Sequence, residues 1–145
     1  MKALIQRVKK ASVTINSELY SEISAGMLVF LGVEKGDTEE NAQKLAQKLV
    51  NLRIFEDEQE KMNKSLIDVN GEMLVVSQFT LCGDCKKGTR PSFDKSAPPE
   101  IAERLYEIFV KNISSFNVSV KTGKFRAMMD VALINDGPVT FMVEK

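Results

Sequence analysis

The alternation of apolar and polar positions predicts a fold that is rich in β-strands. Val13 and Ile15 alternate with polar neighbours, as in a half-buried strand. Residues 27–33 form an uninterrupted apolar run, which is typical of a strand covered on both faces. The first part of the chain therefore predicts strands at residues 3–8, 13–15, 19–23 and 27–33, with a turn at Asn16–Ser17.

Two stretches repeat their apolar residues at helical spacing. The first covers residues 38–51, and Asp37 with Glu40 fits a capping box at its start. The second begins at Pro98–Pro99, because proline is tolerated in the first turn of a helix, and runs to about residue 115.

The remaining apolar segments predict further strands and turns. We expect a strand at 53–55, an acidic turn region at 56–64, a strand or turn at 65–69 and a hairpin at Asn70–Gly71; further strands are expected at 73–81, 118–122, 131–134 and 139–143. Since strands and two long helices do not alternate regularly, the predicted class is α+β, in a single domain spanning residues 1–145.

The stretch Met73–Leu81 looks like the organising element. It begins as a buried apolar strand and becomes polar at Ser77, Gln78 and Thr80, so that hydrogen-bonding groups would lie at the tip of a rigid strand. A second stretch, Asn135–Thr140, has a similar character, with Gly137–Pro138 as a tight connection that is a candidate for a cis peptide bond. We expect these two stretches to form one site.

Composition and charge exclude several classes of protein. The 145 residues include no histidine, which removes Ser-His and Cys-His nucleophiles and zinc sites that need histidine. Twenty basic and twenty acidic side chains argue against non-specific coating of nucleic acid. No apolar run approaches the roughly 18–20 residues of a membrane span, and the start does not resemble a signal peptide. We therefore expect a cytoplasmic protein with no membrane association, metal or cofactor.

Cys82 and Cys85 form a CxxC motif, which occurs in redox pairs and in half of a zinc site. A second cysteine or histidine pair is absent, and the following Lys-Lys-Gly is poor helix-opening sequence, so we favour two incidental thiols. The glycines at 83 and 88 resemble a phosphate loop, but the required Lys-Ser/Thr does not follow them.

Lys86, Lys87 and Arg90 form a basic cluster directly after the organising stretch. Such a cluster can be a solvated loop or a loop that contacts the phosphates of a nucleic acid. Its position beside the predicted strand tip favours phosphate contact.

Together these motifs resemble the D-aminoacyl-tRNA deacylases over the length of the chain. Ser77–Leu81 is similar to the family's Ser-Gln-Phe-Thr-Leu signature, and Asn135–Thr140 resembles its second signature, which contains a Gly-cisPro pair. Gln6-Arg7-Val8 and the segment 87–93 also match. Thr89 departs from the pattern, which commonly has a second arginine there.

The resemblance implies a homodimer with a barrel-like α+β fold that hydrolyses the ester of D-aminoacyl-tRNA, and also mischarged glycyl-tRNA. It implies that Gly137–Pro138 of one subunit enters the pocket of the other and rejects L-amino acids. We expect Ser77, Gln78, Gly137 and Pro138 to bind substrate.

For the chemistry itself, we expect the backbone amides around Phe79 and Thr80 to be the catalytic donors to the oxyanion, with water as the nucleophile. Two other classes of function remain open. The first is a non-catalytic RNA-binding barrel, and the second is a CxxC oxidoreductase.

Overall fold

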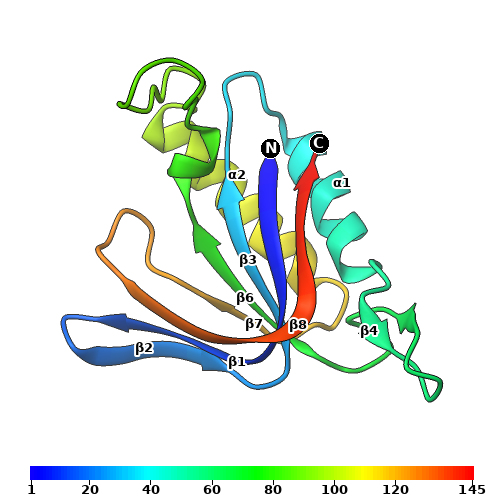
Figure 1. Ribbon diagram of the computed structural model, residues 1–145. Coiled ribbons are helices and arrows are strands. Elements are labelled where there is room, and N and C mark those ends of the chain that lie inside the picture. Colours follow the sequence, from blue (N-terminus) through cyan, green and yellow to red (C-terminus); the bar gives the residue numbers. More distant parts are fainter.

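A computed structural model describes all of residues 1–145 as one mixed β-sheet, a small second sheet and two helices (Figure 1). The main sheet has the strand order β2-β1-β3-β6-β7, and β8 also pairs with β1. The β3–β6 and β6–β7 pairs are parallel, and the others are antiparallel. The elements are β1 Lys2–Ile15, β2 Glu18–Ile23, β3 Gly26–Gly32, α1 Glu39–Val50, β4 Phe55–Glu56, β5 Met62–Lys64, β6 Glu72–Ser77, the 3₁₀-helix η1 Phe79–Cys82, α2 Pro99–Ser114, β7 Val120–Thr122 and β8 Asp130–Glu144.

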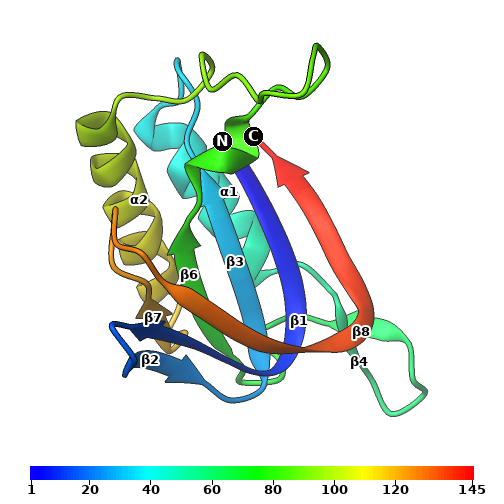
Figure 2. The ribbon, with the colours of Figure 1, turned by 60° about the vertical axis from the view of Figure 1, so that its left-hand side comes forward.

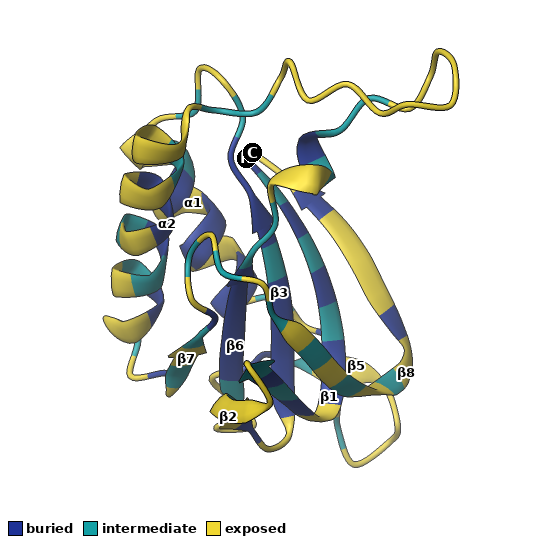
Figure 3. Ribbon diagram, turned by 90° about the vertical axis from the view of Figure 1, so that its left-hand side faces the viewer, coloured by how far each residue is buried: buried dark blue, intermediate teal, exposed yellow.

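The core lies on both faces of this sheet. Met27, Val29 and Leu31 of β3 point to the face that α1 and α2 cover, where the larger apolar cluster lies (Figures 1 and 2). Leu28 points to the opposite face and packs in a smaller cluster with residues of β1, β2 and β6, such as Val13. Figure 3 shows β3 and β6 buried along almost their whole length. Burial on both faces explains why their sequences are continuous apolar runs, and the α+β prediction with two helices is confirmed.

The first two predicted strands, 3–8 and 13–15, are in fact one long strand. β1 pairs with β3 through Lys2–Val8 and with β2 through Ala11–Ile15. The exposed Lys9 and Lys10 lie where the strand leaves one neighbour for the other. Two consecutive lysines are typical of a break between strands, but Lys9 and Lys10 lie within the continuous strand β1.

The prediction of two separate strands at residues 131–134 and 139–143 is wrong, because both segments belong to the single strand β8. Asn135 pairs with Val8 and Thr140 pairs with Gln6, so four residues of β8 lie opposite a single residue of β1. The chain therefore bulges instead of reversing. The Asn135 side chain closes the bulge by donating hydrogen bonds to the Arg7 carbonyl, at 3.2 Å, and to the Val139 carbonyl, at 3.1 Å.

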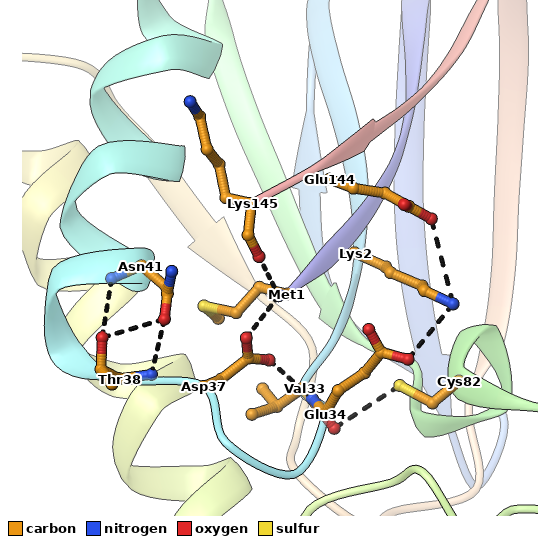
Figure 4. Close-up of polar contacts among 10 residues, drawn as sticks. All are labelled: Met1, Lys2, Val33, Glu34, Asp37, Thr38, Asn41, Cys82, Glu144 and Lys145. Atoms are coloured by element: carbon orange, nitrogen blue, oxygen red, sulfur yellow. Dashed lines mark hydrogen bonds and ion pairs between the residues drawn. The ribbon is translucent and has the colours of Figure 1, made fainter.

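The N-cap of helix α1 is Thr38, one residue after the predicted cap Asp37. Thr38 and Asn41 form the box, in which the Asn41 amide donates to Thr38 Oγ1 and the Thr38 amide donates to Asn41 Oδ1 (Figure 4). Asp37 is not the cap, because its carboxylate accepts hydrogen bonds from the Met1 ammonium and the Glu34 amide. Helix α2 agrees with its prediction, and neither helix combines the length and apolar character that crossing a bilayer requires.

The segment between α1 and β6 differs from its prediction. The short strand begins at Phe55 and pairs with β5, which lies inside the expected acidic turn region. Asn70–Gly71 does not form a hairpin, since β6 pairs in parallel with β3 and β7. It closes a local turn instead, in which the Gly71 amide donates to the Leu66 carbonyl.

Candidate functional site

The organising strand ends earlier than predicted, at Ser77 instead of Leu81. The Gln78 amide still donates to the Leu31 carbonyl at 2.8 Å, and the chain then turns into η1. Gly32 at the end of β3 makes this turn fit, because a Cβ there would lie 3.0 Å from Cys82 Sγ and 3.1 Å from the Gln78 carbonyl oxygen. The polar signature is thus carried by a tight turn packed on the end of the sheet.

The backbone amides of Phe79 and Thr80 are the first two of η1. The first intrahelical bond runs from the Leu81 amide to the Gln78 carbonyl, at 3.2 Å, so the two preceding amides have no partner within the helix. Both residues are exposed. The Thr80 hydroxyl accepts a hydrogen bond from the Gln78 side-chain amide, which is a donor and not a base. This turn therefore offers amide donors and a polar edge, but no activated side-chain nucleophile.

A polar network holds the end of the sheet beside η1 (Figure 4). The Met1 ammonium donates to Asp37 Oδ1 at 2.6 Å and to the Lys145 carbonyl. Lys2 Nζ lies 3.2 Å from Glu34 Oε1 and 3.9 Å from Glu144 Oε1. The hydrogen bond to Glu34 raises the pKa of Lys2 above its ordinary value. The network ties the ends of both terminal strands to the loop before α1.

The two cysteines of the CxxC motif lie in different environments, and both are free thiols. Cys82 is buried at the end of η1, where its Sγ donates to the Val33 carbonyl at 3.5 Å. Burial raises the pKa of its thiol, which disfavours the reactive thiolate. Cys85 is exposed on the following loop. No group of three or more Cys, Asp or Glu side chains is arranged to hold a metal ion.

The basic cluster is at the tip of a loop that rises directly from η1 (Figure 2). Asp84 and Ser92 close the loop with two backbone hydrogen bonds of 2.8 and 3.0 Å. Beyond this bridge Lys86, Lys87 and Arg90 are exposed, and none of them forms a salt bridge. Their positive charge is therefore free to meet a negatively charged partner.

The loop also borders an open pocket of about 430 Å³, lined by Arg90, Pro91, Ser92, Phe93 and Asp94. At the base of the loop, a hydrogen bond from the Lys86 amide lowers the pKa of Asp84. The Asp84 carboxylate lies 3.8 Å from Lys95 Nζ. The acid at the base of the loop is thus partly neutralised by its neighbours.

Gly137 and Pro138 are exposed in the bulge of β8 and are joined by a cis peptide bond. They do not meet Ser77 within the same chain. Ser77 lies beside Leu31, whose partner on β1 is Ala3, whereas the bulge faces Arg7. At about 3.3 Å per residue, these two points are about 13 Å apart along β1. A single chain thus presents the two signatures at separate places.

Arg7 is a residue whose role sequence reasoning missed. The sequence pointed to it only as part of the Gln6-Arg7-Val8 match, yet it is only 5% exposed. Its Nε lies 3.0 Å from both the carbonyl and the carboxylate of Asp136, its Nη1 donates to the Ile54 carbonyl at 2.8 Å, and its Nη2 lies 3.1 Å from Glu56 Oε1. Arg7 thereby fixes the bulge that carries Gly137. The available signal was strand alternation, because Arg7 follows the buried Ala3 and Ile5 at a spacing of two.

Comparison with known proteins places this geometry in a family. Residues 4–144 match the family model described as D-Tyr-tRNA(Tyr) deacylase. Two similar proteins named D-aminoacyl-tRNA deacylase are each 57% identical to this chain. The one from Thermodesulfovibrio yellowstonii aligns over 99% of this chain and 98% of its own length, and the one from Pelobacter propionicus aligns over 100% of both.

Two solved structures have a similar fold. A structure named c-Myc DNA Unwinding Element Binding Protein superposes with a TM-score of 0.94 at 42% identity, covering 100% of this chain and 99% of that one. A probable eukaryotic D-amino acid tRNA deacylase superposes with a TM-score of 0.84, covering 99% and 98% of the two chains. At 17% identity, the second structure supports the fold alone.

Proposed function

The chain belongs to the D-Tyr-tRNA(Tyr) deacylase family, and from this premise we propose that it hydrolyses the ester joining a D-amino acid to the 3′-terminal adenosine of tRNA. The observation that carries the proposal is 57% identity, over the full length of both chains, to a protein named D-aminoacyl-tRNA deacylase. The activity belongs in the cytoplasm, where charged tRNAs are used.

Hydrolysis of this ester does not need a strong nucleophile, because an aminoacyl ester is already activated. In our proposal the free amides of Phe79 and Thr80 donate hydrogen bonds to the oxyanion that forms when water attacks the carbonyl, while Ser77 and Gln78 bind the substrate. One such donor contributes about 2.7–4 kcal/mol to the stability of a transition state. The Thr80 hydroxyl already accepts a bond from the Gln78 amide and has no base beside it. The ribose 2′-hydroxyl of the tRNA is then the local group that assists the attacking water.

Chirality is read, in this proposal, by the main chain at Gly137–Pro138 of a partner protomer. Its carbonyls hold the α-amino group of the substrate, so that an L side chain would collide with the backbone and a D side chain would point away. Glycine has no side chain to reject, so glycyl-tRNA passes. Exclusion of this kind depends on rigidity. The contacts of Asn135 and Arg7 with the bulge support it by fixing the backbone there.

A homodimer is needed, since the two signatures lie apart within one chain. The outer edge of β8 supports such an assembly, because β8 pairs only with β1. Phe141 and Met142 on this strand are 42% and 50% exposed. An unpaired edge that carries large apolar side chains is a surface that proteins usually cover.

The test is incubation with D-aminoacyl-tRNA and matched L-aminoacyl-tRNA, in the presence of a chelator. We expect loss of the D-ester, preservation of the L-ester and no effect of the chelator. Binding of tRNA with no loss of ester would instead favour a non-catalytic nucleic-acid-binding barrel, a role suggested by the name of the similar DNA-element-binding structure. Dithiol-dependent reduction of disulfides would favour the redox alternative.

A further inference from the structure

Phe79 and Phe93 form an exposed aromatic pair between η1 and the basic loop. Their ring centroids are 5.1 Å apart, with the planes tilted by 58°. Phe79 is 57% exposed and Phe93 is 38% exposed. Neither ring is buried in the core, so the apolar surface of the pair is available to a partner.

The backbone holds Phe93 in this position. The two hydrogen bonds between Asp84 and Ser92 fix the chain directly before it. Its ring also lies against Gly83, where a Cβ would be 3.0 Å from Phe93 Cε1 and 2.9 Å from the Thr80 carbonyl oxygen. The ring is therefore set by a closed loop and a glycine, and does not depend on burial for its placement.

Charge around the pair favours a nucleic acid. Lys86, Lys87 and Arg90 lie beyond Phe93 at the tip of the loop and are exposed. The nearby acids have local partners, since Asp84 accepts from the Lys86 amide at 2.9 Å and Asp94 accepts from the Ser92 hydroxyl at 2.9 Å. Exposed aromatic rings next to a basic segment are what proteins use to bind unpaired nucleotides, because each base has a face that can stack.

We infer that Phe93 stacks on the nucleobase that precedes the aminoacylated adenosine of tRNA. The inference rests on the proposed function, which puts the ester at the amides of Phe79 and Thr80. Phe79 then lies beside the terminal adenosine, and Phe93 is one ring further toward the loop tip. The next base inward meets Phe93, and its phosphates approach the basic residues. Phe93 is thus a substrate-positioning residue and does not touch the reacting atoms.

The experiment compares two small substrates: a D-amino acid esterified to adenosine, and the same ester on a dinucleotide with a cytidine before the adenosine. For the unaltered protein we expect KM to be about tenfold lower for the dinucleotide, with similar kcat, because stacking of one base has about this effect. Phe93→Leu should raise KM for the dinucleotide about tenfold and leave KM for the adenosine ester unchanged. Phe93→Trp should retain the advantage of the dinucleotide. Tyr20→Leu, which removes another exposed aromatic side chain, should leave KM unchanged for both substrates.

A second measurement does not depend on the variant folding well. With the unaltered protein, an abasic residue in place of the cytidine should raise KM about tenfold, because it removes the stacking base and keeps the phosphate. The stacking role is wrong if Phe93→Leu raises KM equally for both substrates. It is also wrong if the abasic dinucleotide has the same KM as the dinucleotide with cytidine. If the unaltered protein hydrolyses neither ester nor D-aminoacyl-tRNA, the proposed function itself fails.

Discussion

Arg7 shows how a single buried side chain can organise the candidate site. Its guanidinium joins the β8 bulge at Asp136 to the carbonyl of Ile54 and the carboxylate of Glu56. Lysine keeps the charge but lacks the planar fork that reaches several acceptors. We expect Arg7→Lys to lower the free energy of unfolding by roughly 2 kcal/mol, about the contribution of a hydrogen bond to a charged group.

Discrimination against L-aminoacyl-tRNA should fall in the same variant, because the backbone at Gly137 would lose its anchor. The measurements are urea unfolding and hydrolysis of matched D- and L-esters. Lys9→Ala is the control, since Lys9 is exposed on the same strand. Unchanged selectivity in Arg7→Lys would show that the bulge does not depend on this side chain.

The two thiols offer a second test at the scale of residues. Burial raises the pKa of Cys82, so its thiolate is scarce at neutral pH and gains population only as the pH rises. We expect iodoacetamide to label Cys85 in the folded protein and to label Cys82 only after unfolding. Mass spectrometry of the labelled peptides provides the measurement, and Cys85→Ser is the control that should leave the native protein unlabelled. Rapid native labelling of Cys82 would reopen the redox interpretation.

Sequence reasoning predicted that Ser77–Thr80 follow a buried strand, but it did not predict the conformation of the chain there. Ser77–Thr80 stood out as a candidate because polar residues follow an apolar run there, and this change is evident from the sequence alone. The turn into η1 was missed, since it depends on β3 ending at Gly32 and on close packing there. The role of Arg7 was missed for a related reason: a charged residue is a surface residue by default, and only its distant partners make it a core residue.

At the scale of elements, the bulge in β8 is the feature that the prediction of two separate strands could not anticipate. Asp136–Gly137 is a local hairpin signal, and the proline that follows it removes a donor from the outgoing strand. The pairing of both halves with β1 overrides that signal, and long-range pairing cannot be read from a local motif. The helices were predicted well because their signal, an apolar face repeated over several turns, is local.

Asn135 closes this bulge and gives a prediction for the element as a whole. Asn135→Ala removes two hydrogen bonds to main-chain carbonyls and should cost about 1 kcal/mol of stability, because the side chain is exposed and water replaces part of the loss. The backbone at Gly137 should become more mobile, so hydrolysis of L-esters should rise relative to D-esters.

The matched control for this change is Asn51→Ala. Asn51 also donates from its side chain to a main-chain carbonyl, that of Gln47, but at the end of α1. The Asn51→Ala protein should be less stable, with no change in its selectivity between D- and L-esters. If both variants have the same selectivity, the bulge closed by Asn135 does not determine chiral discrimination.

At the scale of the whole molecule, the separation of the two signatures makes a quantitative prediction about assembly. Phe79→Pro removes one proposed oxyanion donor at a helix position where proline is tolerated. Gly137→Val introduces a side chain where a Cβ would lie 2.6 Å from Asn135 Oδ1. Each variant alone should form a dimer with little activity.

Mixing these two variants by joint unfolding and refolding should restore activity if each site draws on both protomers. A mixed dimer then has one site with both defects and one with neither. Since about half of randomly assorted dimers are mixed, about a quarter of all sites should be intact. The measurement is D-ester hydrolysis by the mixture, relative to the unaltered protein, with dimers verified by sedimentation. Sites built within one protomer would yield no intact site in any combination, so absence of recovery, or a monomeric protein, would rule out the shared arrangement.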